Sequence, residues 1–282
     1  MSLLTIAALA LLAVGAVLAA GEILSKPSRH TLGDAPALLH ASNVRIATSG
    51  GHIAGWLVKG APGRGAVLLM HGVRGNRSDM LARARFLARD GYTVLLIDLP
   101  SHGESSGDRI TFGAHEKDGA NAALAYLEHE FPAERIGVIG VSLGAAALVL
   151  AHPHPAPAAV VLESMYPTID EAVANRLKMR PGAVGGSLAP LLVQQVPLRT
   201  GVSPAALRPV DEIGALPSPV FLISGAADLH TPADETRRIF AAIRGPKQLW
   251  LIDGAAHVDL HEYAQEEYER RVGGFLAEHL RR

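Results

Sequence analysis

The sequence predicts an α/β fold with a mostly parallel central sheet and helices on both faces. From residue 66 onward, strand and helix patterns alternate along the chain, and the strand segments are almost continuous apolar runs. Strands of that kind are buried on both sides, because the helices that connect parallel strands cover both faces of the sheet. With 282 residues, of which 49% are hydrophobic, the chain is long enough to form a sizeable core around such a sheet.

The expected elements follow one another in a regular order. A hairpin with strands at 44–48 and 53–60 precedes further strands at 66–71, 93–99, 135–140, 159–164, 219–225 and 247–253. Helices are expected at 78–91, 114–130, directly after residue 142, at 233–243, and from residue 260 onward. Residues 167–207 break this alternation with helical pieces that four prolines and a Gly-Gly pair interrupt. We therefore predict a small inserted lid at 167–207.

The N-terminal residues form a separate segment. Leu3 to Ala20 is a run of 18 residues without a charge, and a helix of that length spans roughly 27 Å, close to the thickness of a membrane core. We predict a membrane anchor or, as the alternative, a cleaved signal segment at 1–24, followed by a tether at 25–43 and the main domain at 44–282. Since Lys26 and Arg29 follow the run, an anchor would leave the domain in the cytoplasm, whereas cleavage would give a secreted or periplasmic protein.

Composition argues against several classes of function. The net charge is −1 and no stripe of Lys and Arg runs through the chain, so we expect no nucleic-acid partner. The chain contains no cysteine, which excludes disulfides, thiol nucleophiles and cysteine-based metal sites. No HExxH motif or clustered Asp and His pattern is present, so we expect neither a metal nor a cofactor.

One serine is flanked by glycines where a strand is expected to end and a helix to begin. The stretch at 140–144 reads GVSLG, with Ser142 at its centre. A serine on such a sharp turn is held in a strained backbone conformation with Oγ exposed, and the glycines have no Cβ to clash with the neighbouring strand and helix. The N-terminus of the helix adds free N–H groups and a partial positive charge. The context predicts that Ser142 is a nucleophile.

A serine hydroxyl is a poor nucleophile without a base, and the base needs an orienting carboxylate. Of the 13 histidines, His257 follows the last predicted strand and is the predicted base. Asp228 follows strand 219–225 and is the predicted acid, whereas Asp253 is nearer to His257 in sequence but lies at the strand end itself. All these positions fall at the carboxyl ends of parallel strands, where open α/β sheets bind ligands.

These motifs together make the chain similar to the α/β-hydrolases over about residues 44–280. The resemblance rests on MHGVRGN (70–76), DLPSHGES (98–105), GVSLGA (140–145), SGAADLHTP (224–232) and GAAH (254–257). The stretch LESMYPTIDEA also resembles the branch that contains membrane-tethered abhydrolase-domain and prolyl-oligopeptidase-like serine hydrolases.

The resemblance implies an α/β-hydrolase fold and a triad in the chain order Ser142, Asp228, His257. It also implies an oxyanion hole formed by the backbone N–H groups of Val73 and Leu143. The expected reaction is cleavage of a small-molecule acyl ester or thioester through an acyl-enzyme intermediate. His71 and His102 are expected to be structural.

Two alternative functions remain open at this point. A serine peptidase or aminopeptidase on the same fold would need a group that grips the carboxylate or amine of its substrate. Arg74 and the cluster of Arg176, Lys178 and Arg180 are candidates, although we expect that cluster to form a solvated face of the lid. A non-catalytic binding protein on the same fold would be expected to lack a member of the triad, and here all three positions are filled.

Substrate preference depends on a short helix predicted in the lid. The stretch LAPLLVQQVPL at 188–198 places apolar residues at helical spacing on one face, namely Leu188, Leu191, Leu192 and Val196. This face either packs against the core or lines the binding pocket. In the second case we expect a preference for apolar acyl groups over charged ones.

Overall fold

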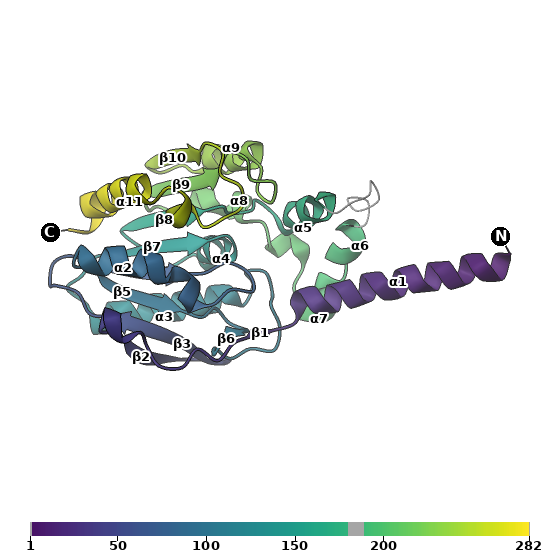
Figure 1. The fold of residues 1–282 in the computed structure, drawn as a ribbon, viewed down its shortest axis with the longest axis horizontal. Coiled ribbons are helices and arrows are strands. Elements are labelled where there is room, and N and C mark those ends of the chain that lie inside the picture. Colours follow the sequence, from purple (N-terminus) through teal and green to yellow (C-terminus); the bar gives the residue numbers. More distant parts are fainter. Residues whose placement is uncertain (1, 180–188, 282) are drawn as a thin grey trace.

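An eight-stranded sheet runs through the described part of the chain, which in this computed structural model comprises residues 2–179 and 189–281 (Figure 1). The spatial order of the strands is β10 (Lys247–Ile252), β9 (Val220–Gly225), β8 (Ala159–Glu163), β7 (Ile136–Val141), β4 (Ala66–Met70), β5 (Thr93–Ile97), β3 (Gly51–Val58) and β2 (Ser42–Thr48). Adjacent strands from β10 to β5 pair in parallel. The hairpin of β2 and β3 extends the β5 edge in antiparallel pairing. The predicted mostly parallel sheet is confirmed.

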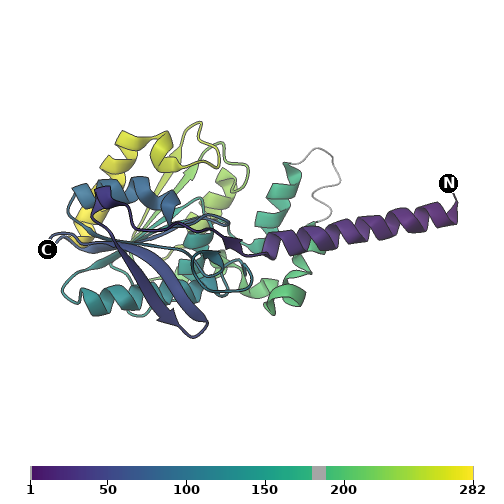
Figure 2. The same cartoon turned by 60° about the horizontal axis from the view of Figure 1, so that its bottom comes forward.

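Helices cover both faces of this sheet, as Figures 1 and 2 show. On one face lie α2 (Leu81–Arg89) and α11 (Gln265–Leu280), and on the other α3 (Glu116–Glu130), α4 (Leu143–Ala151) and α9 (Ala233–Ala242). Successive residues of a strand point to opposite faces, so Leu68 belongs to the core beneath α3 and α4, whereas Leu69 belongs to the core beneath α2 and α11. Both cores are apolar, which explains the continuous apolar runs in the sequence.

The segment between β8 and β9 contains α5 (Ile169–Lys178), α6 (Ala189–Val193), α7 (Val196–Thr200) and α8 (Pro209–Glu212). Val193 and Val196 are buried in a small apolar cluster with Leu150, Ile169 and Leu207. Of the apolar face predicted at 188–198, Leu192 and Val196 are buried against the protein, whereas Leu191 is 49% exposed and Leu188 lies outside the described residues. That residues 167–207 act as a lid stays a prediction.

The N-terminal run forms the helix α1 (Leu3–Ser25), which projects away from the sheet in both views (Figures 1 and 2). Within the described ranges, however, no helix is both long enough and apolar enough to cross a membrane. The prediction of a membrane anchor at 1–24, and of a membrane location with it, is therefore wrong. The prediction rested on the apolar run alone. The last turns of α1 make polar contacts with the rest of the protein, since Gln195 Nε2 donates to the Val17 carbonyl at 3.2 Å and Glu22 forms an ion pair with Arg109 at 3.0 Å.

The chain between α1 and β2 makes specific contacts. Strand β1 (Ser28–Arg29) pairs in parallel with β6 (His102–Gly103). The backbone N–H groups of Leu32 and Gly33 donate hydrogen bonds to Glu104 Oε1 at 3.1 and 3.3 Å. The division of the chain at residues 25 and 44 stays a prediction.

Candidate active site

Ser142 occupies the sharp turn between β7 and α4. Its φ of 49° and ψ of −104° lie in a region that non-glycine residues rarely adopt. A Cβ atom at Gly140 would lie 2.7 Å from the backbone nitrogen of Ala145, and one at Gly144 would lie 2.6 Å from the carbonyl oxygen of Met70. The two glycines are therefore required because α4 packs directly against the carboxyl ends of β7 and β4.

His257 and Asp228 lie in two loops at the same edge of the sheet. The distance between His257 Nδ1 and Asp228 Oδ2 is 2.7 Å, although the residues are 29 positions apart. Asp228 Oδ1 also accepts the backbone N–H of Thr231 at 3.0 Å, and Oδ2 accepts the Thr231 hydroxyl at 2.7 Å. Burial raises the pKa of Asp228, but the hydrogen bonds from His257 and Thr231 outweigh it and hold this pKa below its usual range. Asp228 is therefore an anion at neutral pH, and it lies in hydrogen-bond contact with the imidazole of His257.

A second histidine stands beside this pair. The ring centroids of His230 and His257 are 4.5 Å apart, and burial together with His257 lowers the pKa of His230. Ligand atoms of Asp228, His230 and His257 all lie within 4.8 Å of one another, so the three side chains have the donor set for a metal ion. Both oxygens of Asp228 already accept hydrogen bonds from within the protein.

Ser142 and His257 line one cavity of about 320 Å³, together with Gly72, Val73, Ser164 and Arg176. Ser142 is only 3% exposed, and its Oγ has no hydrogen-bond partner among the residues that the structure describes. Within the described residues, no hydrogen bond therefore joins Ser142 to His257. The structure thus gathers Ser142, Asp228 and His257 at one edge of the sheet.

The loop after β4 passes beside the turn that carries Ser142. A Cβ atom at Gly72 would lie 3.7 Å from Ser142 Cβ, so the loop runs at van der Waals distance from the serine. Val73 lines the cavity, and Leu143 is the first residue of α4, where a backbone N–H has no intrahelical partner. Both N–H groups that the sequence predicts as oxyanion donors thus belong to segments that border Ser142.

His71 holds this loop in place. Its Nε2 accepts the backbone N–H of Leu99 at 3.0 Å, which leaves Nδ1 to donate to the Gly72 carbonyl at 2.7 Å. Burial, with a smaller contribution from His102, lowers the pKa of His71 from 6.5 to about 3. His71 is therefore a neutral structural residue.

The low pKa of His71 predicts a pH-dependent stability. Below pH 6.5 the unfolded chain takes up a proton at His71 that the folded chain refuses until about pH 3. The free energy of unfolding should therefore fall with decreasing pH, by about 1.4 kcal/mol per pH unit from this residue. Urea unfolding between pH 7 and 5 should show that His71→Gln lacks this part of the slope, whereas the exposed control His115→Gln keeps it. Parallel curves for wild type and His71→Gln would contradict the assignment.

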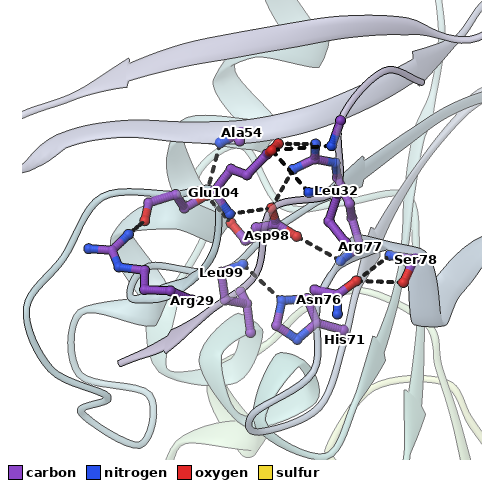
Figure 3. Close-up of polar contacts among 12 residues, drawn as sticks. Arg29, Leu32, Ala54, His71, Asn76, Arg77, Ser78, Asp98, Leu99 and Glu104 are labelled. Carbon is purple, nitrogen blue, oxygen red and sulfur yellow. Dashed lines mark hydrogen bonds and ion pairs between the residues drawn. The ribbon is translucent and has the colours of Figure 1, made fainter. Parts of the chain in front are cut away.

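Figure 3 shows a second anchor of the same loop, centred on Arg77. The buried guanidinium of Arg77 forms ion pairs with Asp98 and with Glu104, and its backbone N–H donates to Asp98 Oδ1 at 2.7 Å. The same guanidinium stacks over the Trp56 ring, 4.5 Å from its centroid. This network links the ends of β4 and β5 and fixes the path of the chain that carries Val73.

Another buried ion pair, between Arg83 and Glu163, borders the same cavity. Arg83 donates two hydrogen bonds to Glu163, at 3.0 and 2.6 Å, and a third to Asp259 at 2.9 Å. The Glu163 carbonyl accepts the backbone N–H of Ser142 at 2.7 Å, and Asp259 lies two residues after His257. Arg83 thus connects the loops that carry both residues.

Removal of Arg83 should be strongly destabilising. Arg83 and Glu163 are 1% and 0% exposed, so Arg83→Met would leave the buried Glu163 carboxylate without its cation, at a cost of about 3–5 kcal/mol. The matched control is Arg85→Met on the exposed side of the same helix, which should change the free energy of unfolding by less than about 0.5 kcal/mol. Urea denaturation measures both, and equal effects of the two variants would refute the role of Arg83.

Arg77, Arg83 and Glu163 were not among the residues predicted from the sequence. A signal for Arg83 was present, because it interrupts the apolar face that Met80, Ala84 and Leu87 form on the expected helix. Sequence alone gives no partner for it, since Glu163 is 80 residues away.

The structure describes two residues of the predicted cluster of Arg176, Lys178 and Arg180, and their surroundings differ. Lys178 is exposed, as expected for a solvated face, and Arg180 lies outside the described residues. Arg176 instead is half-buried and lines the cavity of Ser142, so the expectation of a solvated face is wrong for Arg176.

Comparison with known proteins places this geometry in a family. Residues 67–271 match the alpha/beta hydrolase family. The chain is 30% identical over 276 residues to the protein Rv2307c of Mycobacterium tuberculosis, covering 92% of this chain and 91% of that protein. It is 28% identical over 214 residues to YqkD of Bacillus subtilis, covering 74% and 70% of the two chains.

A solved structure of esterase Pf2001 from Pyrococcus furiosus has a similar fold, with a TM-score of 0.75 and 25% sequence identity, covering 90% of this chain and 98% of the other. The fold, the resemblance found in the sequence and the family match agree. The chain is therefore a hydrolase that belongs to the alpha/beta hydrolase family.

Proposed function

We propose that this hydrolase is a serine esterase or thioesterase that acts through an acyl-enzyme intermediate. The observation that supports it most is the short contact between His257 and Asp228 at the cavity that Ser142 lines. An aspartate at Nδ1 leaves Nε2 of His257 free to act as the base.

In this mechanism Ser142 Oγ attacks the acyl carbon while His257 Nε2 takes the hydroxyl proton. The carbonyl oxygen becomes an oxyanion, which the backbone N–H groups of Val73 and Leu143 stabilise by hydrogen bonding. Collapse of the tetrahedral intermediate breaks the bond to the alcohol or thiol, and His257 returns the proton to that leaving group. Water then attacks the acyl-enzyme by the same route and releases the acid, which restores Ser142.

The cavity suits a short acyl group. Its apolar lining includes Val73, Met80, Val141 and Val258, and each methylene buried against such side chains contributes up to about 0.8 kcal/mol of binding. The described residues of 189–198 do not line this cavity, so the lid helix that the sequence suggested as an apolar pocket wall gives no support for long chains. The similarity to a protein named as an esterase also favours ester substrates.

The experiment compares an ester, a thioester and an anilide that carry the same butyryl group. Hydrolysis of the ester and the thioester with a higher kcat/KM than the anilide is the expected result. A preference for the anilide would favour the peptidase alternative instead. Absence of turnover together with no reaction of a fluorophosphonate probe would favour a non-catalytic binding protein.

A further inference from the structure

Arg176 on α5 presents a cation to the cavity of Ser142 without an acidic partner. One guanidinium nitrogen, Nη1, donates to the carbonyl of Ala172 in its own helix at 3.0 Å. Across residues 2–179 and 189–281, no carboxylate lies within ion-pair distance of Arg176. The remaining positions 1, 180–188 and 282 contain neither Asp nor Glu in the sequence. Among the described residues, Arg176 therefore has no counter-ion within ion-pair distance.

Two fully buried arginines near the site do have acidic partners. Arg77 and Arg83 each bind two carboxylates, as expected for guanidinium groups withdrawn from water. Burial lowers the pKa of Arg176, and Tyr166 and Asp228 offset this effect only in part. Of the acidic residues that line the same cavity, Asp259 is already bound to Arg83 and Asp79 is exposed.

Ser164 is a second, independent indication that this cavity binds a polar ligand. This residue lines the same cavity and is 3% exposed, and its buried Oγ has no hydrogen-bond partner among the described residues. Its backbone has a φ of 46°, in the left-handed region that costs a non-glycine residue free energy. A buried hydroxyl without a partner is unfavourable, and a ligand that accepts a hydrogen bond would remove that cost.

We propose that Arg176 and Ser164 form a subsite for a carboxylate group of the substrate. The enzyme would then prefer acidic esters, in which a carboxylate is carried either by the acyl group or by the leaving group. A guanidinium fits this role because it binds carboxylates through paired N–H groups. This inference rests on the proposed esterase function, and it reverses the ranking of apolar over charged substrates that the sequence suggested.

The test uses two pairs of esters, each with a free carboxylate and with its methyl ester. In the first pair, 4-nitrophenyl succinate and its methyl ester, the charge lies on the acyl side. In the second, 4-acetoxybenzoate and its methyl ester, it lies on the leaving group. For each pair the measured quantity is the ratio of kcat/KM for the acid to kcat/KM for the methyl ester. The wild type should give a ratio of about 10 to 100 in at least one pair, the range expected for hydrogen bonds to a charged group.

Substitution at the subsite should remove this preference. Arg176→Gln should bring the ratio to about 1, Ser164→Ala should lower it severalfold, and Arg176→Lys should retain part of it because the charge remains. Lys178→Gln is the matched control on the same helix, since Lys178 is exposed and does not line the cavity, and it should keep the wild-type ratio. Each ratio compares two substrates on one preparation, so partial unfolding of a variant does not change it.

A wild-type ratio near 1 in both pairs, or a high ratio that Arg176→Gln leaves unchanged, would overturn the inference. In those cases the neutral esters are still hydrolysed, and the proposed esterase function stands. If no ester is hydrolysed and a fluorophosphonate does not react, the proposed function fails and the carboxylate subsite is overturned with it.

Discussion

Replacement of Ser142 by alanine is expected to lower kcat for ester hydrolysis by about four to six orders of magnitude, the loss typical for a serine nucleophile. The reason is chemical, because alanine has no oxygen to carry the acyl group. The fold should be preserved, since Ser142 Oγ makes no hydrogen bond within the described chain. Stopped-flow or steady-state kinetics on a chromogenic ester measure the loss, and thermal unfolding checks that the variant is folded.

Ser164→Ala is a useful comparison in the same assay. Ser164 lines the same cavity and its hydroxyl is likewise buried without a partner, so it is the other serine positioned to act as a nucleophile. Its removal should leave most of the turnover of a neutral ester. Near wild-type turnover in Ser142→Ala, with a large loss in Ser164→Ala, would show that the nucleophile was assigned to the wrong serine.

The substitution Asp228→Asn should lower kcat by about four orders of magnitude. The carboxylate accepts the Nδ1 proton of His257 at 2.7 Å and stabilises the imidazolium that forms during the reaction. An asparagine has a similar size but favours the wrong imidazole tautomer, and it loses the charge.

Asp253→Asn is the matched control, because Asp253 is the alternative acid suggested by the sequence. Asp253 is exposed and makes no hydrogen bond to His257, so its substitution should change kcat less than about threefold. The same ester assay is used for both variants. A larger loss in Asp253→Asn than in Asp228→Asn would assign the orienting role to Asp253.

Much of the fold could be predicted from the sequence because its signals are local. The apolar runs gave the strands of the parallel sheet, and the glycines around Ser142 indicated a turn whose crowding the structure explains. The predicted ends of two strands also located the loops that carry Asp228 and His257. These loops lie together because the carboxyl ends of parallel strands meet at one edge of the sheet.

The features that could not be predicted from the sequence depend on contacts between residues far apart in the chain. Arg83 and Glu163 are 80 positions apart, so the position of Arg83 on an apolar helix face indicates burial but not the carboxylate that it binds. Arg176 was expected on a solvated face because nothing in its neighbours indicates which side of α5 borders the cavity. The apolar run at the N-terminus predicted a membrane anchor, although no described helix meets the requirements for crossing a membrane.

The most direct test of the central claim is to identify the residue that a fluorophosphonate labels, by mass spectrometry of the digested full-length protein. Such probes react with activated serines, so we expect a single adduct on Ser142, with a much slower reaction in Asp228→Asn because His257 is no longer oriented. The adduct should be absent in Ser142→Ala. An adduct on a different residue, or ester hydrolysis that continues while Ser142 stays unmodified, would contradict a mechanism based on this serine.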